Sequence, residues 1–519
     1  MAEPITSILI VGGGTAGWMA AAALKRSVGP HCEVTLVESD DIGIVGVGEA
    51  TVPSIRDFNA LIDLDEAEFM RETKATLKLG IEFVGWGAAD SRYIHPFGTY
   101  GAGAALGEFH QTWLALRARG LAEDLDAYSL CAQACHAGKA ALRDGDPRSP
   151  IAPLFTAYHF DAGLYARYLR KVCEGRGVRR VEGEIVEVVQ REDGFVDHVR
   201  LKDDRTLTAD LFIDCTGFRA LLIEGAMKAG FEDWSRWLPM NRAMAVPCAR
   251  VGPTTPYTRS TARDAGWQWR IPLQHRTGNG HVYCADFTTD EDARETLMAN
   301  LDGEPLAAPR PLRFTTGRRR ASWVKNCLAL GLAAGFMEPL ESTSIHLVQS
   351  GLTRFLKVFP DKRFNPLTTA AYNRATEHEY ELIRDFLVLH YKATQRDDTP
   401  FWRHCRDMVI PDSLAGKIDY FREYGHLLIE SGDLFKEENW LQVLIGQGIL
   451  PRAPAPLARN IDRQSLVTYM TDLRGSYARA AAALPSHEAY LARVMQAAAA
   501  ASRSQASGAV TRSLDATPR

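Results

Sequence analysis

A glycine-rich turn between a short apolar strand and a helix constrains the fold of this chain more than any other feature. The string GGGTAG at 12–17 directly follows a run of apolar residues that predicts a buried strand. In such a turn Gly12 permits a tight bend, Gly14 lets backbone N–H groups approach a pyrophosphate, and Gly17 allows close packing of the helix on the strand. Glu38 ends the next predicted strand, about twenty residues later, where a carboxylate can bind ribose hydroxyls and disfavours a 2′-phosphate. The sequence therefore predicts a strand–helix–strand unit that binds FAD or NAD.

The composition is typical of a globular protein that acts on a small molecule. The chain has 519 residues, of which 46% are hydrophobic, so it can bury a sizeable core. Its formal net charge of −4 gives no excess of positive charge for nucleic acid or an anionic membrane. No apolar run reaches the length of about 18 residues that a membrane span needs.

The cysteines indicate a reducing compartment and no metal site. There are nine of them, and none forms a CxxC pair. Cys131, Cys135 and His136 lie close in sequence, but further ligands in register are missing, so we expect no metal there. Buried, unpaired thiols are typical of a cytoplasmic protein.

Periodicity predicts an α/β fold that becomes helical toward the C-terminus. Asp65 and Glu68 predict a helix start, and Phe69, Thr73 and Leu77 would form the buried stripe of that helix.

Three further stretches complete the pattern. Residues 105–145 are rich in alanine and leucine and are predicted to be helical. Turn signals at Asp193-Gly194 and Asp203-Asp204 predict antiparallel hairpins that return to a strand at 211–214. A strand-rich stretch then extends to about residue 325, and helical patterning dominates beyond residue 345.

Residues 267–272, WQWRIP, allow two interpretations. Trp267, Trp269 and Ile271 alternate along a predicted strand and can simply fill a core. With Pro272 they can also form a bulky wall beside a ligand.

Several strings at separate places resemble those of flavin-dependent halogenases. WQWRIP is similar to the WxWxIP signature of that family, and GVGEATVP at 46–53 is similar to its GxGEATxP strap. Lys78 precedes an FVxW segment, and FMEPLEST at 336–343 resembles the EPLEST segment. The strings HPF, RDF, HY and PFW extend the resemblance over roughly residues 5–450.

This resemblance implies an α/β, FAD-binding Rossmann-like domain of the flavin monooxygenase and halogenase type. It would comprise a core over 1–360 with mixed β-sheets and an inserted β-sheet region for the substrate tunnel, and an α-helical substrate lobe over 361–490. The composition of residues 491–519, rich in Ala, Ser, Thr and Arg without periodicity, predicts a disordered tail. The string DCTG at 214–217 resembles a strand-to-turn element of FAD monooxygenases. The predicted cofactor-binding residues are Gly12, Gly14, Thr15, Ala16, Gly17, Glu38, Gly48, Glu49, Ala50 and Leu332.

The sequence and the family resemblance together indicate how the FAD is reduced. The chain has no second glycine fingerprint for NADPH, so reduced FAD is expected to come from a separate flavin reductase, as in the halogenase family. Leu332 stands where aromatic hydroxylases carry an aspartate that binds the ribityl chain, which disfavours a simple hydroxylase.

The resemblance also implies a chemistry for Lys78 and Glu341. Reduced FAD and oxygen convert halide into hypohalous acid, which reaches Lys78 and is held there by a hydrogen bond or captured as a haloamine. Glu341 would orient the oxidant and accept the ring proton. The halide would bind at the backbone of Thr343 and Ser344. Ser344 replaces the glycine of tryptophan halogenases. If that glycine has a positive φ, serine costs about 1 kcal/mol, and bromide, being easier to oxidise, is then the expected halide.

The substrate is expected to be an indole-type aromatic. Tryptophan-specific members bind the amino-acid carboxylate with a tyrosine pair after an asparagine, whereas Asn439 is followed here by Trp440 and Leu441. A substrate without a free amino-acid end is therefore predicted. The alternatives are an FAD-dependent aromatic hydroxylase and a non-catalytic flavin-binding protein. The predicted substrate and tunnel residues are His95, Phe97, Trp267, Trp269, Ile271, Pro272 and Trp440.

Overall fold

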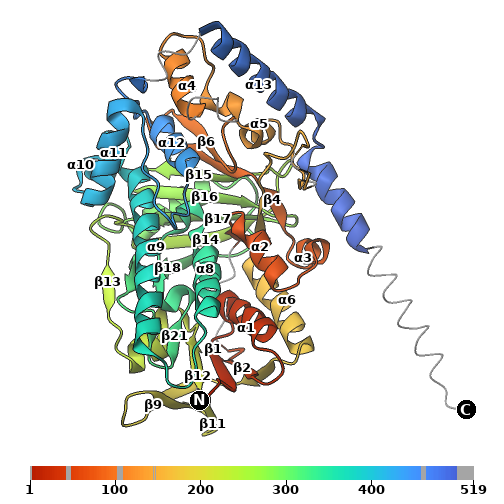
Figure 1. Cartoon of the computed structure of the whole chain (residues 1–519), viewed down its shortest axis with the longest axis vertical. Coiled ribbons are helices and arrows are strands. Elements are labelled where there is room, and N and C mark those ends of the chain that lie inside the picture. Colours follow the sequence, from red (N-terminus) through yellow and green to blue (C-terminus); the bar gives the residue numbers. More distant parts are fainter. Residues whose placement is uncertain are drawn as a thin grey trace, which may run out of the picture.

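The computed structural model describes residues 3–41, 48–101, 109–143, 145–146, 148–456 and 463–499 (Figure 1). Residues 46–47 of the predicted strap, 105–108 and 144 of the predicted helical stretch and 500–519 of the predicted tail lie outside these ranges. The architecture is mixed α/β, as the sequence predicts.

The glycine turn belongs to a six-stranded sheet. β1 pairs in parallel with β2 on one side and with β12 on the other, and α1 connects β1 to β2. This is the predicted strand–helix–strand unit. α1 packs against α6 and α8 (Figure 1). The elements are β1 (Ser7–Val11), β2 (Glu33–Glu38), β8 (Arg179–Glu182), β12 (Leu211–Asp214), β20 (Trp323–Val324), β21 (Cys327–Ala329), α1 (Thr15–Val28), α6 (Ala162–Gly175) and α8 (Thr343–Lys357).

A seven-stranded sheet forms the second layer. Its order is β18-β14-β17-β16-β15-β5-β6, and its neighbours are antiparallel except for the parallel pair β15 and β5. The WQWRIP segment lies on β16, between β15 and β17. The strands are β5 (Gly80–Val84), β6 (Arg92–Pro96), β14 (Arg242–Cys248), β15 (Thr258–Arg263), β16 (Gly266–Pro272), β17 (Thr277–Tyr283) and β18 (Arg310–Arg313).

Three smaller sheets have three strands each. In one, β7 lies between β3 and β4 and so joins the strap to the strand of Lys78. Another forms the predicted antiparallel hairpins before β12. The strands are β3 (Gly48–Ala50), β4 (Thr76–Lys78), β7 (Ala157–Asp161), β9 (Ile185–Gln190), β10 (Val196–Leu201), β11 (Thr206–Thr208), β13 (Phe231–Asp233), β19 (Gly317–Arg319) and β22 (Gly335–Phe336).

Helices dominate after α8, and they pack directly on the seven-stranded sheet. One buried hydrophobic cluster contains Phe83 and Trp267 of the sheet together with Phe386, Trp402 and Trp440 of the helices. No described helix is both long and apolar enough to cross a bilayer. The remaining helices are α2 (Ser54–Leu61), α3 (Glu66–Glu72), α4 (Phe109–Arg117), α5 (Leu130–His136), α7 (Asp290–Ala299), α9 (Pro366–Lys392), α10 (Pro400–Asp407), α11 (Asp412–Tyr424), α12 (Glu437–Gly446), α13 (Arg463–Ala483) and a last helix over 487–499.

Two predicted helical stretches are wrong in extent. Asp65 caps α3 by accepting a hydrogen bond from the Glu68 N–H, as predicted, but α3 ends at Glu72, and Leu77 lies on a strand. Residues 76–78 are all buried and pair with β7, and this strand pairing overrides the helical spacing. Among the described residues of the alanine-rich stretch, only α4, a 3-10 turn at Leu125–Tyr128 and α5 are helical.

The last helix is fixed to the strand of Lys78. His487, 1% exposed, accepts a hydrogen bond from the Leu77 N–H through Nε2 (3.0 Å), 410 residues away in sequence. Its Nδ1 lies 3.0 Å from the Thr254 carbonyl oxygen, which can only accept, so the ring is neutral with its proton on Nδ1. Burial lowers the pKa of His487 to about 4, although the Thr254 carbonyl opposes this. β4 is an edge strand, and His487 therefore satisfies a backbone N–H that β7 cannot reach.

We predict that His487→Ala lowers the free energy of unfolding by about 1–3 kcal/mol, because it leaves the Leu77 N–H buried and unpaired. Urea denaturation at pH 7.5 measures this. The exposed His136 provides the control, since His136→Ala should change stability by less than about 0.5 kcal/mol.

The pH dependence gives a second check of this contact. The folded pKa of about 4 lies below the ordinary 6.5, so neutral His487 contributes stability above pH 6.5 that is lost as the pH falls through 4. The difference between the native chain and His487→Ala should therefore narrow over this range. Equal stability of the two proteins at pH 7.5 would contradict the assignment.

Candidate functional site

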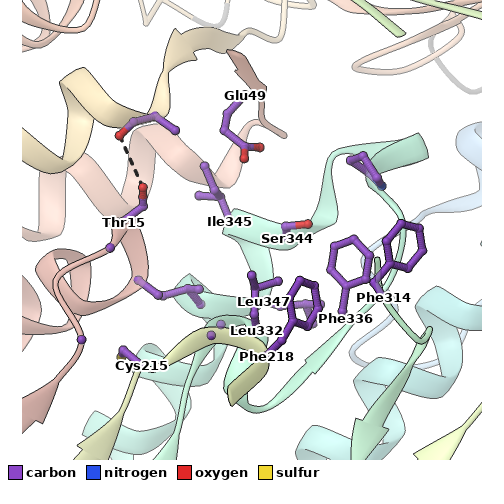
Figure 2. Close-up of a pocket in the computed structure, with 18 of the residues that line it drawn as sticks. Thr15, Glu49, Cys215, Phe218, Phe314, Leu332, Phe336, Ser344, Ile345 and Leu347 are labelled. Atoms are coloured by element: carbon purple, nitrogen blue, oxygen red, sulfur yellow. Dashed lines mark hydrogen bonds between the residues drawn. The ribbon is translucent and has the colours of Figure 1, made fainter. Parts of the chain in front are cut away.

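A cavity of about 550 Å³ connects the glycine turn to the wall on β16. Its lining includes the turns at 12–16, 215–217 and 331–332, and the strap at 48–50. Trp267, Trp269 and Ile271 line it as well, as does the start of α8. Figure 2 shows Glu49, Ser344 and Leu332 around this cavity.

The glycine turn fits a pyrophosphate. Gly12 has φ +108°, and a Cβ there would overlap the Cys215 carbonyl. A Cβ on Gly17 would overlap the Gly12 carbonyl, which explains the close packing of α1 on β1. A Cβ on Gly14 would meet no protein atom within 4 Å, so this glycine borders space available to a ligand. α1 begins there without an acidic residue in its first turn, which suits an anion.

Two carboxylates of the predicted cofactor site, Glu38 and Glu49, border the cavity. Glu38 receives the Arg180 guanidinium at Oε1 (2.7 Å). Glu49 points into the cavity (Figure 2), and burial raises its pKa to about 7. At neutral pH Glu49 can therefore act as a hydrogen-bond donor or as an acceptor. Thr15, also predicted here, donates to the Ala162 carbonyl at 3.4 Å.

Asp214 plays a structural part. It is fully buried and accepts hydrogen bonds from the Leu222 and Ile223 N–H groups at 2.9 and 2.8 Å. It thus fixes the turn in which Cys215, Thr216 and Gly217 line the cavity.

Three WQWRIP side chains lie in the core and also border the cavity. Trp267, Trp269 and Ile271 are buried and also line one side of the cavity. The Trp267 indole N–H donates to Glu338 (2.9 Å), which also accepts from the Tyr391 hydroxyl (2.8 Å). Burial raises the pKa of Glu338 to about 7, while these two donors oppose the shift.

Lys78 lies just behind the cavity. It is fully buried, and its Nζ donates to the Thr51 carbonyl (3.0 Å) and to Ser342 Oγ (2.8 Å). Ser342 lines the cavity, so one side chain separates Lys78 from it. Nζ is also 5.1 Å from the centre of the Phe97 ring. Burial lowers the pKa of Lys78 to about 7, although Glu341 opposes this.

The start of α8 corrects one expectation about Ser344. The residue with a positive φ is Ser342, at +61°, whereas Ser344 lies inside the helix. The predicted backbone strain at Ser344 is therefore wrong, because the chain reverses two residues earlier. Thr343 Oγ1 is buried and has no hydrogen-bond partner among the described residues, and Ser344 lines the cavity. A helix start with an unpartnered hydroxyl and free N–H groups suits a halide ion.

Glu341 is held by two histidines. Its Oε1 lies 2.9 Å from His95 Nδ1 and 2.8 Å from His390 Nε2. Burial alone would raise the pKa of Glu341, but the two histidines lower it to about 2. His95 Nε2 in turn contacts Asn439 Nδ2 at 2.9 Å.

The structure places most predicted site residues around the cavity or the Lys78–Glu341 cluster, with two exceptions. Trp440 is fully buried against Phe386, and it lines neither this cavity nor a smaller cavity beside α12. Pro272 does not line the cavity, and its carbonyl accepts a hydrogen bond from the Thr76 hydroxyl (2.7 Å). The sequence interpretation missed the contact residues Thr51, Ser342, Glu338 and His390. Three of these residues lie inside strings on which the family resemblance rests, and His390 begins the HY string. The sequence therefore pointed to these positions but did not indicate which contacts their side chains make.

A second cavity of about 240 Å³ lies beside α12. Tyr100 and Phe109 provide aromatic walls, and Glu437 and Glu438 provide carboxylates. His110 Nδ1 pairs with Glu437 at 2.5 Å. The remaining lining residues are Thr99, Gly101 and Leu441, so no lysine or arginine borders this cavity among the described residues.

The chain resembles known proteins over nearly its whole length. The family model described as tryptophan halogenase matches residues 7–463. Tryptophan 6-halogenase SttH of Streptomyces toxytricini is 35% identical over 94% of this chain and 98% of its own length. Tryptophan 7-halogenase RebH of Lentzea aerocolonigenes is 36% identical over 88% of this chain and 92% of its own length.

Solved structures agree with this similarity. Xcc4156, a flavin-dependent halogenase from Xanthomonas campestris, matches with a TM-score of 0.92 and 46% identity, over 95% of this chain and 99% of its own. BrvH, a flavin-dependent halogenase from Brevundimonas sp. BAL3, matches with a TM-score of 0.91 and 43% identity, over 94% of this chain and 99% of its own.

We predict that Gly14→Ala and Gly17→Ala separate flavin binding from folding. Gly14→Ala should keep the thermal stability of the native chain but weaken FAD binding at least tenfold, because its methyl group enters the ligand space. Gly17→Ala should lose both, since α1 must move away from Gly12. Calorimetric titration with FAD and thermal unfolding measure these effects. Unchanged FAD affinity in Gly14→Ala would place the pyrophosphate elsewhere.

Proposed function

The chain belongs to the tryptophan halogenase family and is a flavin-dependent halogenase, an oxidoreductase, and we propose that it halogenates an indole-type aromatic through Lys78 and Glu341. Its electrons would come from a separate flavin reductase, because the sequence has no second glycine fingerprint for NADPH. Nine free, buried cysteines support a cytoplasmic location.

The single observation that carries the proposal is the position of Lys78. A fully buried amine lies one side chain behind the cavity, and the buried Glu341 carboxylate acts on its pKa. A structural lysine would be exposed or paired with a carboxylate, whereas Lys78 has two neutral acceptors. This arrangement suits a group that receives a small oxidant from the cavity.

The cofactor and the chain divide the chemistry. Reduced FAD, when bound, supplies the two electrons with which oxygen and halide give hypohalous acid and water. The N-terminus of α8 would hold the halide at Thr343 and Ser344, and the wall on β16 would keep the aromatic substrate away from the flavin.

Lys78 and Glu341 would complete the reaction. Lys78 polarises hypohalous acid or captures its halogen, since a desolvated amine with a pKa of about 7 can do either. A ring carbon then forms its bond to the halogen, whose bond to oxygen or nitrogen breaks. Glu341 takes the ring proton, and the C–H electron pair restores aromaticity.

The substrate is proposed to lack a free amino-acid carboxylate. Trp440 and Leu441 follow Asn439 and offer no phenolic hydroxyl. The cavity beside α12 carries Glu437 and Glu438, which repel a carboxylate. Indole or an indole with a neutral or cationic side chain fits these surroundings better than tryptophan.

One assay tests the proposal against the alternative of an aromatic hydroxylase. The chain is supplied with a flavin reductase, NADH, FAD, bromide and indole under air, and the product is identified by mass. Bromoindole is the expected product, whereas hydroxyindole would select the hydroxylase.

We predict that Lys78→Ala abolishes bromination of indole by more than a thousandfold while FAD affinity stays within twofold, because Lys78 contacts no part of the glycine turn. Product mass and calorimetric FAD titration give the two measurements. Retained bromination would remove Lys78 from the mechanism, and lost FAD affinity would make it a structural residue.

We predict that the chain brominates faster than it chlorinates at equal halide concentration. The Ser344 side chain narrows the cavity at the helix start, and bromide is the more easily oxidised ion. Ser344→Gly should bring the two rates closer together. Ser27→Gly, a helical serine outside the cavity lining, is the control and should leave the ratio unchanged. A native preference for chloride would contradict this account of the halide site.

A further inference from the structure

The hydrogen bonds around Glu341 determine where the protons of the cluster lie. Asn439 Oδ1 accepts the Lys436 N–H at 2.7 Å, so the Asn439 amide must direct its N–H toward His95. His95 Nε2 therefore accepts, and its single proton lies on Nδ1, 2.9 Å from Glu341 Oε1. His95 is a neutral ring with a fixed tautomer.

His390 has the opposite constraint. Its Nδ1 lies 2.8 Å from the Phe386 carbonyl oxygen, which can only accept, so Nδ1 carries a proton. Its Nε2 lies 2.8 Å from the same Glu341 oxygen, and a carboxylate there also requires a donor. Both nitrogens of His390 thus donate, and the ring is an imidazolium.

The contacts of Lys78 complete the charge count. Its Nζ has two acceptors, Thr51 and Ser342, which match the two N–H bonds of an uncharged amine. In the described part of the chain no further acceptor is found for a third N–H. An imidazolium at His390, a carboxylate at Glu341 and a neutral Lys78 sum to zero charge, which favours this state in a fully buried cluster.

We propose that His390 is a positioning residue that serves as the permanent counter-cation of Glu341 and thereby leaves Lys78 as an uncharged amine. The two histidines occupy Oε1 of Glu341, while no hydrogen bond to Oε2 is found within the described ranges, so Oε2 is the oxygen that faces the reaction. The inference rests on the proposed function of Lys78 and Glu341 and deepens it.

The same three side chains resemble a metal site, but their protons oppose one. One donor atom each of His95, Glu341 and His390 lie within 4.8 Å of one another, a ligand set that suits a divalent transition metal. Asn439 holds the proton of His95 on Nδ1, the nitrogen that a metal would need.

Other titratable groups pack around the cluster, and of these Glu338, whose pKa burial raises to about 7, carries part of a negative charge at neutral pH. Tyr93 and His95 face it from β6, His159 from β7 and Glu338 from the segment before α8. Burial raises the pKa of Tyr93 and lowers that of His159, so both are neutral near pH 7. His390 is therefore the cation whose loss Lys78 should sense.

Neutron diffraction from the unmodified protein without flavin, exchanged into heavy water at pH 8, tests the proton assignment directly. We expect two ring deuterons on His390, one on His95, two on Lys78 Nζ and none on Glu341. A deuteron on Glu341, or three on Lys78, would overturn the proposal. Because no turnover is needed, this result is independent of the proposed function. Zinc seen in the cluster after soaking in micromolar ZnCl₂ would equally overturn it.

Variants of His390 test the consequence for Lys78. His390→Gln keeps a hydrogen-bond donor but removes the positive charge, so the pKa of Lys78 should rise. In the plot of kcat against pH, the acid limb, where kcat falls as Lys78 becomes protonated, should then move up by about one pH unit. Because the native pKa of Lys78 is about 7, the turnover number then falls about fivefold at pH 7, while KM for indole and FAD affinity stay within twofold. His390→Lys restores a cation and should return the limb toward its native position.

His378 lies exposed on the same helix, and His378→Gln is the matched control with no expected shift. An unshifted limb in folded His390→Gln, or equal shifts in His390→Gln and His390→Lys, would reduce His390 to a packing role and overturn the proposal.

Discussion

The hydrogen bonds of the Lys78 amine are the interaction on which the rest of the site depends. A buried amine needs acceptors, and Lys78 obtains them from Thr51, in the strap, and from Ser342, before α8. Its own strand is fixed by pairing with β7 and by His487 on the last helix. One nitrogen is therefore bonded both to the strap and to the segment before α8, and its strand is bonded to the last helix.

Burial acts on the two key side chains in opposite ways. It lowers the pKa of Lys78 to about 7, because a charged amine is costly away from water. It would raise that of Glu341, but His95 and His390 reverse the effect and lower the pKa to about 2. The surroundings thus shift the pKa values of both groups downward, but for different reasons. They favour an uncharged amine that can react with the oxidant and an ionised carboxylate that can accept a proton.

The fold and the cofactor site could be predicted from sequence wherever the signal is local. The turn at 12–17 depends on steric requirements of adjacent residues, and the positive φ of Gly12 follows from them. The helix predicted through Leu77 failed because strand pairing with β7 outweighs local periodicity. The strain assigned to Ser344 failed because sequence cannot show which residue of a turn reverses the chain, and Ser342 does so.

Long-range contacts could not be predicted in the same way. Lys78 and Ser342 are 264 residues apart in sequence. His390 contacts Glu341 because it lies near the end of α9, a helix of 27 residues that packs on the seven-stranded sheet. Strings that resembled a family supplied Lys78 and Glu341 without their partners. The role of Asn439 in fixing the tautomer of His95 depends on a capping contact that only the folded chain shows.

The central claim is that oxidant formed in the cavity reaches the aromatic ring only by way of Lys78. The most direct test is the partition of bromine between indole and a reactive 1,3-diketone scavenger in the same reaction, with the native chain and with Lys78→Ala. The account predicts that bromine appears on indole in the native chain and on the scavenger in the variant, at similar oxygen consumption. Bromination of indole by the variant at the native share would contradict it.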